Sequence, residues 1–329
     1  MRVLTLSHRD VLAALSPEDC AEAMAAVLAE HARGGTYLPL RSVMVPPGAA
    51  GFLGLMPGWR AGDQNGAAAF ALKAVCIMPG NPARGLDAHQ GLVTLFDGET
   101  GVPTAILDAS AVTAVRTAAV TAVATRLLAR GDARVLAILG AGTQARAHLR
   151  ALAGVRDFAQ VRVYAPTEAH AQALVEEGGV ARGEFGVAVS AEEAVRDADV
   201  VVTVTSAREP VLRHGWLKPG AHVNAVGANA ADRRELDPEI VLRAAVVVTD
   251  DIEQAQREAG EFIDLHKAGR LDWMSVKALH QIVAAQNFAR ADGALTLFKS
   301  LGVGLEDVAA ASLIYDRAMV SGRFGVTTN

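Results

Sequence analysis

The sequence is poor in aromatic residues and lacks an excess of positive charge. Aromatic side chains make up 5% of its 329 residues, and its apolar content of 51% comes mainly from Ala, Val and Leu. Such small apolar residues suit helices that pack closely on a parallel sheet. The formal net charge is −5, so the chain has no basic surplus of the kind that nucleic-acid-binding proteins carry. We therefore expect a globular protein of about two domains that does not bind nucleic acid.

Long uncharged apolar runs are also missing from the sequence. The first ten residues lack the apolar core of a signal peptide. The most apolar stretch, 105–129, is interrupted by Asp108, Arg116 and Arg126. We therefore expect no membrane span.

Cysteine is scarce, and the histidines form no ligand pattern. Cys20 and Cys76 both lie in apolar stretches, which predicts buried free thiols in a reducing cytoplasm. The nine histidines are scattered without the spacing of metal ligands, so no metal site is expected. The sequence also contains no serine elbow and no P-loop.

The first third of the chain predicts a helix, then a meander of strands, then a second helix. Ser16 followed by Pro17 and two acids is typical of a helix start, and Gly34-Gly35 predicts its end. From about 38 to 107, short apolar runs alternate with turn clusters, which predicts antiparallel β-strands. One long helix is predicted from roughly 110 to 129.

From Ala133 onward the pattern changes to alternating strands and helices. Strands are predicted at 135–139, 161–164, 200–205, 222–226 and 245–249. This alternation is typical of a parallel, doubly wound sheet. The last 30 residues are predicted to be helical and to rejoin the first domain.

A glycine-rich turn, Gly140-Ala141-Gly142-Thr143-Gln144-Ala145, lies between the first of these strands and a helix. Gly140 allows a tight turn, Gly142 lets the backbone approach a pyrophosphate, and Ala145 permits close packing of helix on strand. The helix N-terminus then favours the anion. In this context the motif predicts a bound dinucleotide; the alternative is a glycine turn without a ligand.

The end of the second strand bears on the choice between NAD and NADP. An NAD-binding domain usually has an acid here, which bonds the ribose hydroxyls. This chain has Ala165 at that place, with Arg162 and Thr167 nearby. Because the missing carboxylate removes a repulsion against a 2′-phosphate, the sequence favours NADP(H) slightly, although no arginine stands beside Ala165.

Three cations each stand alone in an apolar segment: Arg41, Lys73 and Arg116. A buried charge without a partner costs several kcal/mol, and none of the three has an acid within its own segment. They could converge on a substrate carboxylate, which arginine grips bidentately. They could equally be three separate ion-paired or snorkelling residues, and the pattern alone leaves both interpretations open.

Several stretches resemble the ornithine cyclodeaminase/mu-crystallin family, and they cover nearly the whole chain in the family's order. These stretches are Leu72-Lys73-Ala74-Val75, Pro79-Gly80-Asn81, Arg116-Thr117-Ala118-Ala119, the turn Gly140 to Ala145, Val226-Gly227-Ala228-Asn229 with Arg234-Glu235-Leu236-Asp237, and Leu297-Phe298-Lys299-Ser300-Leu301-Gly302. The resemblance implies an α/β fold, in which a Rossmann doubly wound parallel sheet is joined to an α+β substrate-binding and dimerisation domain. It places the Rossmann domain at 118–298 and the other domain at 1–117 with 299–329, and it implies a homodimer.

The resemblance also assigns roles to the lone cations and casts doubt on one activity. It implies that Arg41, Lys73 and Arg116 hold the carboxylate of a small amino or imino acid, and that Lys73 assists proton transfer. The family includes cyclodeaminases, alanine dehydrogenases, several imine reductases and the thyroid-hormone-binding mu-crystallin, so membership alone does not fix the reaction. Cyclodeaminases of the family have an aspartate where this chain has Asn229, and an amide cannot serve as a general base.

The leading hypothesis is therefore an NAD(P)H-dependent reductase of small imino acids of the ketimine, pyrroline-2-carboxylate or iminosuccinate type, with the reverse amino-acid dehydrogenase reaction left open. The alternatives are an ornithine cyclodeaminase and a mu-crystallin-like protein that keeps the cofactor to bind a ligand. The predicted catalytic residues are Lys73 and Asn229, and His89 is a further candidate for substrate binding. The predicted cofactor contacts are Thr117, Gly140, Gly142, Thr143, Gln144, Thr167, Thr205, Val226 and Gly227.

Overall fold

The chain folds into two compact units. The structure is a computed structural model that describes residues 2–62, 66–178, 183–285 and 289–328. Unit 1 comprises residues 1–120 and 302–329, and unit 2 comprises residues 121–301. The first division falls inside α3 (Ala109–Leu128). The sequence-based divisions stand after residues 117 and 298, and those of the structure after 120 and 301.

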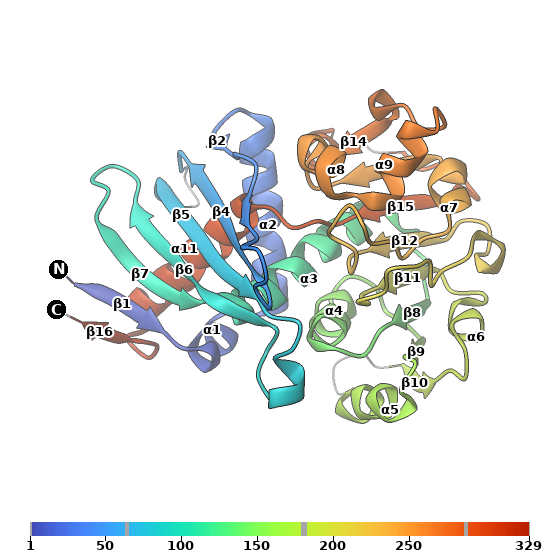
Figure 1. The fold of residues 1–329 in the computed structure, drawn as a ribbon, viewed down its shortest axis with the longest axis horizontal. Helices are drawn as coiled ribbons and strands as arrows, with labels where there is room; N and C mark the ends of the chain where they lie inside the picture. Colours follow the sequence, from blue (N-terminus) through green and yellow to red (C-terminus); the bar gives the residue numbers. More distant parts are fainter. Residues whose placement is uncertain (1, 63–65, 179–182, 286–288, 329) are drawn as a thin grey trace. The chain divides into compact units, whose positions relative to one another are not determined.

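Unit 1 is a mixed sheet with helices against one face (Figure 1). Its strands are β1 (Val3–Leu6), β2 (Thr36–Tyr37), β3 (Ser42–Met44), β4 (Phe52–Arg60), β5 (Ala69–Ile77), β6 (His89–Asp97), β7 (Pro103–Asp108) and β16 (Val326–Thr328). Its helices, besides the start of α3, are α1 (His8–Ala14), α2 (Pro17–Ala32), α11 (Gly304–Ser321) and a 3₁₀ turn at Pro82–Arg84. The strand order is β16-β1-β7-β6-β5-β4-β2, with β3 on β4. β4 to β7 form the predicted antiparallel meander, and β1 pairs with β7 in parallel.

The two faces of this sheet differ because side chains alternate along each strand. On β5, Lys73 and Val75 are buried beneath α11, whereas Phe70 and Cys76 are exposed on the other face. The prediction that both cysteines are buried is therefore wrong for Cys76, although it is confirmed for Cys20 on α2. An apolar neighbourhood in the sequence did not reveal that Cys76 points out of the sheet.

The predicted start of α2 is confirmed. The Ser16 side chain accepts a hydrogen bond from the backbone N–H of Asp19 at 3.2 Å. The prediction for the last 30 residues is only partly right. α11 ends at Ser321, and the left-handed Gly322 (φ 61°) follows it. The chain then forms β16, which pairs antiparallel with β1.

Unit 2 is a parallel sheet with helices packed on it (Figure 1). Its strands are β8 (Val135–Leu139), β9 (Gln160–Tyr164), β10 (Glu184–Val187), β11 (Val200–Thr203), β12 (His222–Ala225), β13 (Val246–Thr249), β14 (Val276–Ala278) and β15 (Thr296–Lys299). Its helices are α4 (Thr143–Ala153), α5 (Glu168–Glu177), α6 (Ala191–Val195), α7 (Pro238–Arg243), α8 (Ile252–Glu258), α9 (Gly260–Lys267) and α10 (Leu279–Ala284), with 3₁₀ turns at His214–Trp216 and Trp273–Ser275. The order is β10-β9-β8-β11-β12-β15-β13-β14.

This order is that of a Rossmann sheet, as the sequence predicts. The chain runs outward from β8 through β9 to β10 and then returns to β11 on the other side of β8. The described strand pairs in this sheet are parallel. The five predicted strands are confirmed to within two residues at each end, whereas β10, β14 and β15 are additional. A dinucleotide binds at the carboxyl edge of such a sheet, where the strand order reverses.

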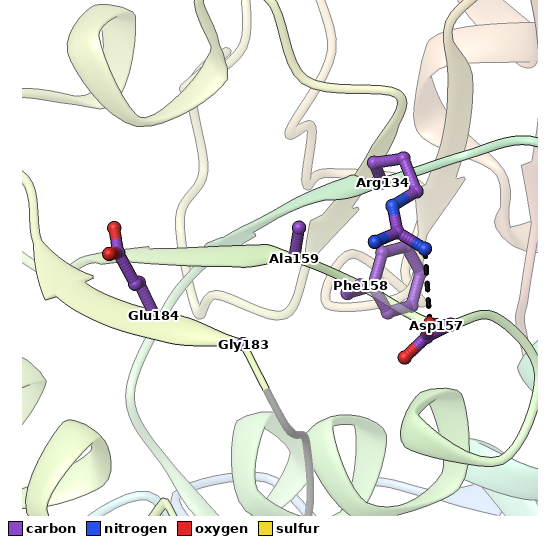
Figure 2. Close-up of a pocket in the computed structure, with 6 residues that line it drawn as sticks. All are labelled: Arg134, Asp157, Phe158, Ala159, Gly183 and Glu184. Carbon is purple, nitrogen blue, oxygen red and sulfur yellow. Dashed lines mark hydrogen bonds and ion pairs between the residues drawn. The ribbon is translucent and has the colours of Figure 1, made fainter.

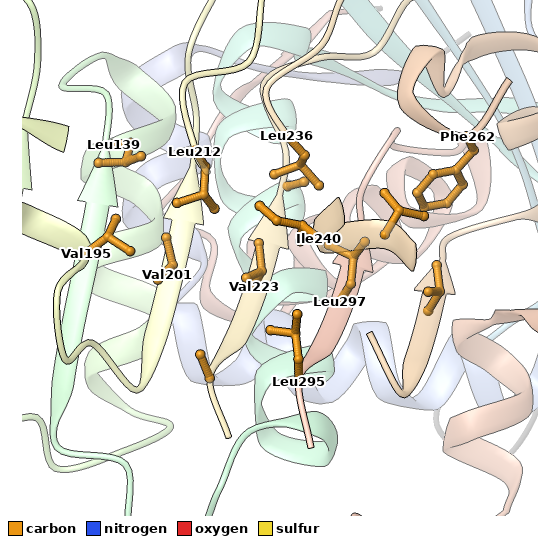
Figure 3. Packing of buried hydrophobic residues seen from close by; sticks show 14 of the residues in the cluster. Leu139, Val195, Val201, Leu212, Val223, Leu236, Ile240, Phe262, Leu295 and Leu297 are labelled. Atoms are coloured by element: carbon orange, nitrogen blue, oxygen red, sulfur yellow. The ribbon is translucent and has the colours of Figure 1, made fainter. Parts of the chain in front are cut away.

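The core of unit 2 explains why its strands read as unbroken apolar runs. Val201, Val223 and Leu297 project from neighbouring strands onto Ile240 of α7 and Phe262 of α9 (Figure 3). All five side chains are buried. Because helices hold this face away from water, the strands need no polar residue at alternate positions.

The helix α3 is long and apolar enough to cross a membrane by length and composition alone. However, 78% of its apolar window is buried inside the protein. Its burial and the ion pairs of Arg116 described below are those of a core helix.

Candidate active site

The glycine turn lies at the carboxyl end of β8, where the sequence predicts it. Gly140 has φ 118°, and a Cβ there would stand 2.6 Å from the backbone oxygen of Val204, so both conformation and space require glycine. Gly142 is the N-cap of α4, and a Cβ there would meet nothing within 4 Å. No side chain caps this helix start. The open space and the uncapped N–H groups fit a pyrophosphate.

Buried residues hold the first turns of α4 in place. Ala145 is fully buried, which is the close packing that the motif predicts. The ring of His148 contacts the Gln144 backbone oxygen at 2.7 Å and Thr121 Oγ1 at 3.1 Å. Burial lowers the pKa of His148 to about 4, so the ring is neutral and holds the helix rather than titrating near neutrality.

The end of β9 offers no simple signature of either cofactor. Thr167 caps α5 without a side-chain cap bond. Arg162 is engaged elsewhere, because its guanidinium donates to the backbone oxygen of Arg196 at 2.5 Å. Arg146 of α4 is a cation beside the glycine turn that the sequence analysis missed. It donates to the backbone oxygen of Ala141 at 3.0 Å and pairs with Glu177.

The remaining predicted cofactor contacts of unit 2 lie along the same edge of the sheet. Thr205 follows β11, and Val226 and Gly227 follow β12. Asn229, two residues further on, is exposed. The structure thus brings the glycine turn and both loops to the carboxyl ends of β8, β11 and β12, which are adjacent strands.

In unit 1, Lys73 lies on β5 with a side chain that is 2% exposed. Its Nζ atom lies 2.9 Å from each carboxylate oxygen of Asp307, and it donates to Thr113 Oγ1 at 3.3 Å. Asp307 is in the first turn of α11. A lysine that reads as lone in the sequence is therefore paired with an acid 234 residues away.

The two arginines lie beside the same helix start. Arg116 of α3 pairs with Glu306 at 2.5 Å through Nη1 and with Asp307 at 3.2 Å through Nε. Arg41, just before β3, donates from Nη2 to the backbone oxygen of Gly302 at 2.7 Å. A Cβ on Gly302 would stand 2.3 Å from Arg116 Nη1. The three predicted cations therefore gather around the start of α11.

Glu306 and Asp307 are the members of this cluster that sequence reasoning missed. Both are buried, at 1% and 0% exposure. The available signal was two adjacent acids at the start of an otherwise apolar helix, 303–311. We call Arg41, Lys73, Arg116, Glu306 and Asp307 the cation cluster; it comprises three cations and two carboxylates.

The cluster changes the acidity of its lysine. The pKa of Lys73 is lowered from 10.5 to about 8, mainly by burial; repulsion from Arg116 contributes to the lowering, and Asp307 opposes it. Buried lysines with lowered pKa values are well suited to proton transfer.

The other predicted residues of unit 1 lie near this cluster. His89 begins β6, and its Nδ1 lies 3.9 Å from Asp87. Burial lowers the pKa of His89, Asp87 opposes this, and the charges of Lys73 and Arg116 lower it further. Thr117 is buried on α3 directly after Arg116, within unit 1.

A separate pocket of about 440 Å³ lies at the opposite edge of the unit 2 sheet (Figure 2). Its lining residues are Arg134, Asp157, Phe158, Ala159, Gly183 and Glu184. They precede or begin β8, β9 and β10. Because these are the amino ends of the strands, the pocket is not the expected dinucleotide site.

The sheet order and the glycine turn define a Rossmann-type dinucleotide-binding protein, to which unit 1 adds the cation cluster. Residues 2–322 match the model of the ornithine cyclodeaminase/mu-crystallin family. The chain belongs to this family, and the resemblance seen in the sequence is confirmed.

Relatives with established names cover nearly the whole chain. Ketimine reductase mu-crystallin of Mus musculus is 38% identical over 90% of both chains. The structure of Δ¹-pyrroline-2-carboxylate reductase of Thermococcus litoralis, in complex with NADH and L-proline, is 34% identical, with a TM-score of 0.92 over 99% of this chain and 100% of that one. An archaeal alanine dehydrogenase dimer with bound NAD is 33% identical, with a TM-score of 0.90 over 100% of this chain and 99% of that one.

Proposed function

We propose that this chain is an NAD(P)H-dependent reductase of small imino acids. The observation that carries the proposal is the cation cluster, in which two arginines and a lysine gather around two buried carboxylates, in a chain that also has a dinucleotide-binding sheet. Relatives named ketimine reductase and pyrroline-2-carboxylate reductase support it. The physiological substrate would be an imino acid whose carboxylate binds the cations of the cluster.

The cofactor would bind along the carboxyl edge of the unit 2 sheet. The N–H groups that follow Gly142 would hold the pyrophosphate, with Thr143 and Gln144 in the same turn. The loops carrying Thr205 and Gly227 would border the nicotinamide half. When bound, the nicotinamide supplies the hydride. Thr117 and Thr167 remain proposed contacts.

The cation cluster would fix the substrate. The guanidinium groups of Arg41 and Arg116 suit a bidentate grip on a carboxylate. Lys73, with a pKa of about 8, holds a proton at neutral pH and can release it to the reacting nitrogen or to water. His89 would border the same site as a neutral ring.

Asn229 supports reduction rather than cyclodeamination. Cyclodeamination oxidises an amine, releases ammonia and closes a ring, which requires a titrating group near the nitrogen. Reduction of a preformed imine requires at that nitrogen only a hydrogen-bond acceptor, which an amide oxygen provides.

The outward face of the unit 1 sheet supports a homodimer. The ring centroids of Trp59 and Phe70 on this face are 6.2 Å apart. Phe70 and Leu92 are 46% and 52% exposed. Large apolar side chains grouped on one face mark an interaction surface. The related alanine dehydrogenase is a dimer. Light scattering should give a dimer mass at micromolar concentration, and a monomer mass would contradict this part of the proposal.

The choice between NADP(H) and NAD(H) and the cellular location also belong to the proposal. We favour NADP(H) over NAD(H) slightly, because no carboxylate stands at Ala165 to repel a 2′-phosphate. We also place the enzyme in the cytoplasm, in keeping with the free thiols of Cys20 and Cys76.

The test is a turnover screen in which NADH and NADPH oxidation is followed with candidate imines. The candidates are pyrroline-2-carboxylate, piperideine-2-carboxylate, pyruvate plus methylamine, and oxaloacetate plus ammonia. We expect oxidation with at least one cyclic imine and no ammonia from L-ornithine. Proline and ammonia formed from ornithine without net cofactor change would establish a cyclodeaminase instead. Cofactor binding without turnover of any imine would favour a ligand-binding protein.

A further inference from the structure

A fully buried carboxylate lies beneath the carboxyl edge of the unit 2 sheet. Glu235, in the segment between β12 and α7, is 0% exposed. Its Oε1 accepts hydrogen bonds from Thr205 N and Oγ1, both at 2.7 Å. Its Oε2 accepts from Gly227 N at 2.7 Å, Thr203 Oγ1 at 2.9 Å and Ala228 N at 3.2 Å. These five donors are backbone amides and hydroxyls rather than cations.

The donors come from the ends of two strands and the loops that follow them. Thr203 ends β11 and leads to Thr205, whereas Gly227 and Ala228 follow β12. The loops are in close contact, since a Cβ on Gly227 would stand 2.1 Å from the backbone oxygen of Thr205. Glu235 therefore ties together the loops that leave two adjacent parallel strands.

The backbone of Glu235 is itself held on both sides. Its N–H donates to Glu261 Oε1 at 3.0 Å, and its carbonyl accepts from Val211 N at 2.8 Å and Leu212 N at 3.0 Å. Glu261 is in turn paired with the buried Lys299 at 3.2 Å. The carboxylate is thus anchored to the sheet, and the loops follow its position.

We propose that Glu235 is a positioning residue for the nicotinamide half of the cofactor. Its hydrogen bonds fix the position of the loop that carries Thr205. They also fix the position of Asn229, because the N–H of the preceding residue, Ala228, donates to the same carboxylate. Among its described hydrogen bonds, none reaches the turn 140–145, which would hold the pyrophosphate. The inference rests on the proposed function only in taking the nicotinamide as the half that reacts.

The substitution Glu235→Gln tests this role with little change in shape. It replaces one acceptor oxygen with an NH₂ group that faces N–H and O–H donors, so the loops must separate. We expect the affinity for ADP-ribose, which lacks nicotinamide, to stay within about twofold of the unmodified protein. NADH affinity should fall about tenfold, and kcat should fall more than the imine KM rises, because misplacement mainly affects reacting geometry.

A matched control lies at the other edge of the same sheet. Asp199 is also a buried carboxylate, and it accepts from Arg134 N at 2.8 Å and Val135 N at 2.9 Å and pairs with Lys218. Asp199→Asn should lower thermal stability while leaving the ratio of NADH to ADP-ribose affinity unchanged. If Glu235→Gln fails to fold, Thr203→Val removes one of the five donors and should shift the same ratio about threefold.

Fluorescence titration with NADH and with ADP-ribose gives the ratio of the two affinities without any turnover. A ratio that is unchanged in Glu235→Gln, or in Thr203→Val when that variant is used, overturns the proposal, as does an equal change in the Asp199→Asn control. If the unmodified protein reduces no imine, the proposed function fails, and the ratio still tests the positioning role.

Discussion

Glu306 and Asp307 in unit 1 and Glu235 in unit 2 are all buried carboxylates, but their partners differ. In unit 1, Glu306 and Asp307 face the cations Lys73 and Arg116. In unit 2, Glu235 faces backbone amides and hydroxyls. Both arrangements satisfy a buried charge, which would otherwise cost several kcal/mol.

The difference shows how one kind of side chain serves two purposes. Glu306 and Asp307 offset the charges of Lys73 and Arg116. The carboxylate of unit 2 fixes the shape of two loops. Substitutions in the cation cluster should therefore alter charge-dependent properties, and substitution of Glu235 should alter the geometry of the two loops.

The largest expected effect follows removal of a cation from unit 1. Arg116→Leu leaves Glu306 and Asp307 buried with less positive charge, which should lower the free energy of unfolding by about 3–5 kcal/mol. Chemical denaturation measures this change.

A paired variant separates stability from binding in this case. Arg116→Leu combined with Glu306→Gln removes both charges of one ion pair, so it should recover much of the stability. It should not recover the imine KM, because the contact with the substrate is still missing. A single Arg116→Leu variant as stable as the unmodified protein would show that the pair contributes little.

In unit 2, Gly142→Val should abolish cofactor binding without unfolding the protein. A side chain there has room in the protein, since no atom lies within 4 Å of its Cβ position, but it would occupy the space of the pyrophosphate. Titration with NADH and NADPH tests the loss, and circular dichroism should show an unchanged fold. Tight binding by this variant would place the cofactor elsewhere.

The pH dependence of stability should reveal Lys73. Its pKa is about 8 in the folded chain, against 10.5 in the unfolded chain. Between these pH values the unfolded chain binds more protons, so the contribution of Lys73 to the free energy of unfolding rises with pH. Denaturant unfolding at several pH values should show a shallower rise in Lys73→Met. Identical pH dependence in both proteins would contradict the lowered pKa.

Lys73 should also determine the alkaline limb of the pH profile of kcat/KM. We expect kcat/KM to fall as pH rises through about 8, where Lys73 loses its proton. Because Asp307 raises the pKa of Lys73, the limb should move to lower pH in Asp307→Asn. An unmoved limb would assign it to another group.

The smallest expected effect concerns Asn229. Asn229→Asp places a titrating group on the loop that follows β12, so it should change the pH dependence of turnover more than its maximum rate. It should also introduce at most slight ammonia release from L-ornithine. A pH profile and an ammonia assay measure the two effects, and an unchanged profile would indicate that the amide only hydrogen-bonds the cofactor.

The sequence predicts what depends on neighbouring residues. The cap at Ser16, the turn at Gly140 and strand β8 follow from local chemistry and are present in the structure. The partners of the lone cations do not follow from it, because Asp307 reaches Lys73 only after the C-terminal helix returns to unit 1. β16 was missed for the same reason, since a strand of three residues forms only against β1.

Comparison of pyrroline-2-carboxylate with its carboxamide tests the central claim most directly. If the cation cluster holds a carboxylate, kcat/KM of the unmodified protein should favour the acid by about 10- to 150-fold, which corresponds to one charge-assisted contact of 1.5–3 kcal/mol. This preference should fall in the stable double variant with Arg116→Leu and Glu306→Gln, which retains Arg41 and Lys73. Equal rates with acid and carboxamide in the unmodified protein, or an undiminished preference in the variant, would contradict the account.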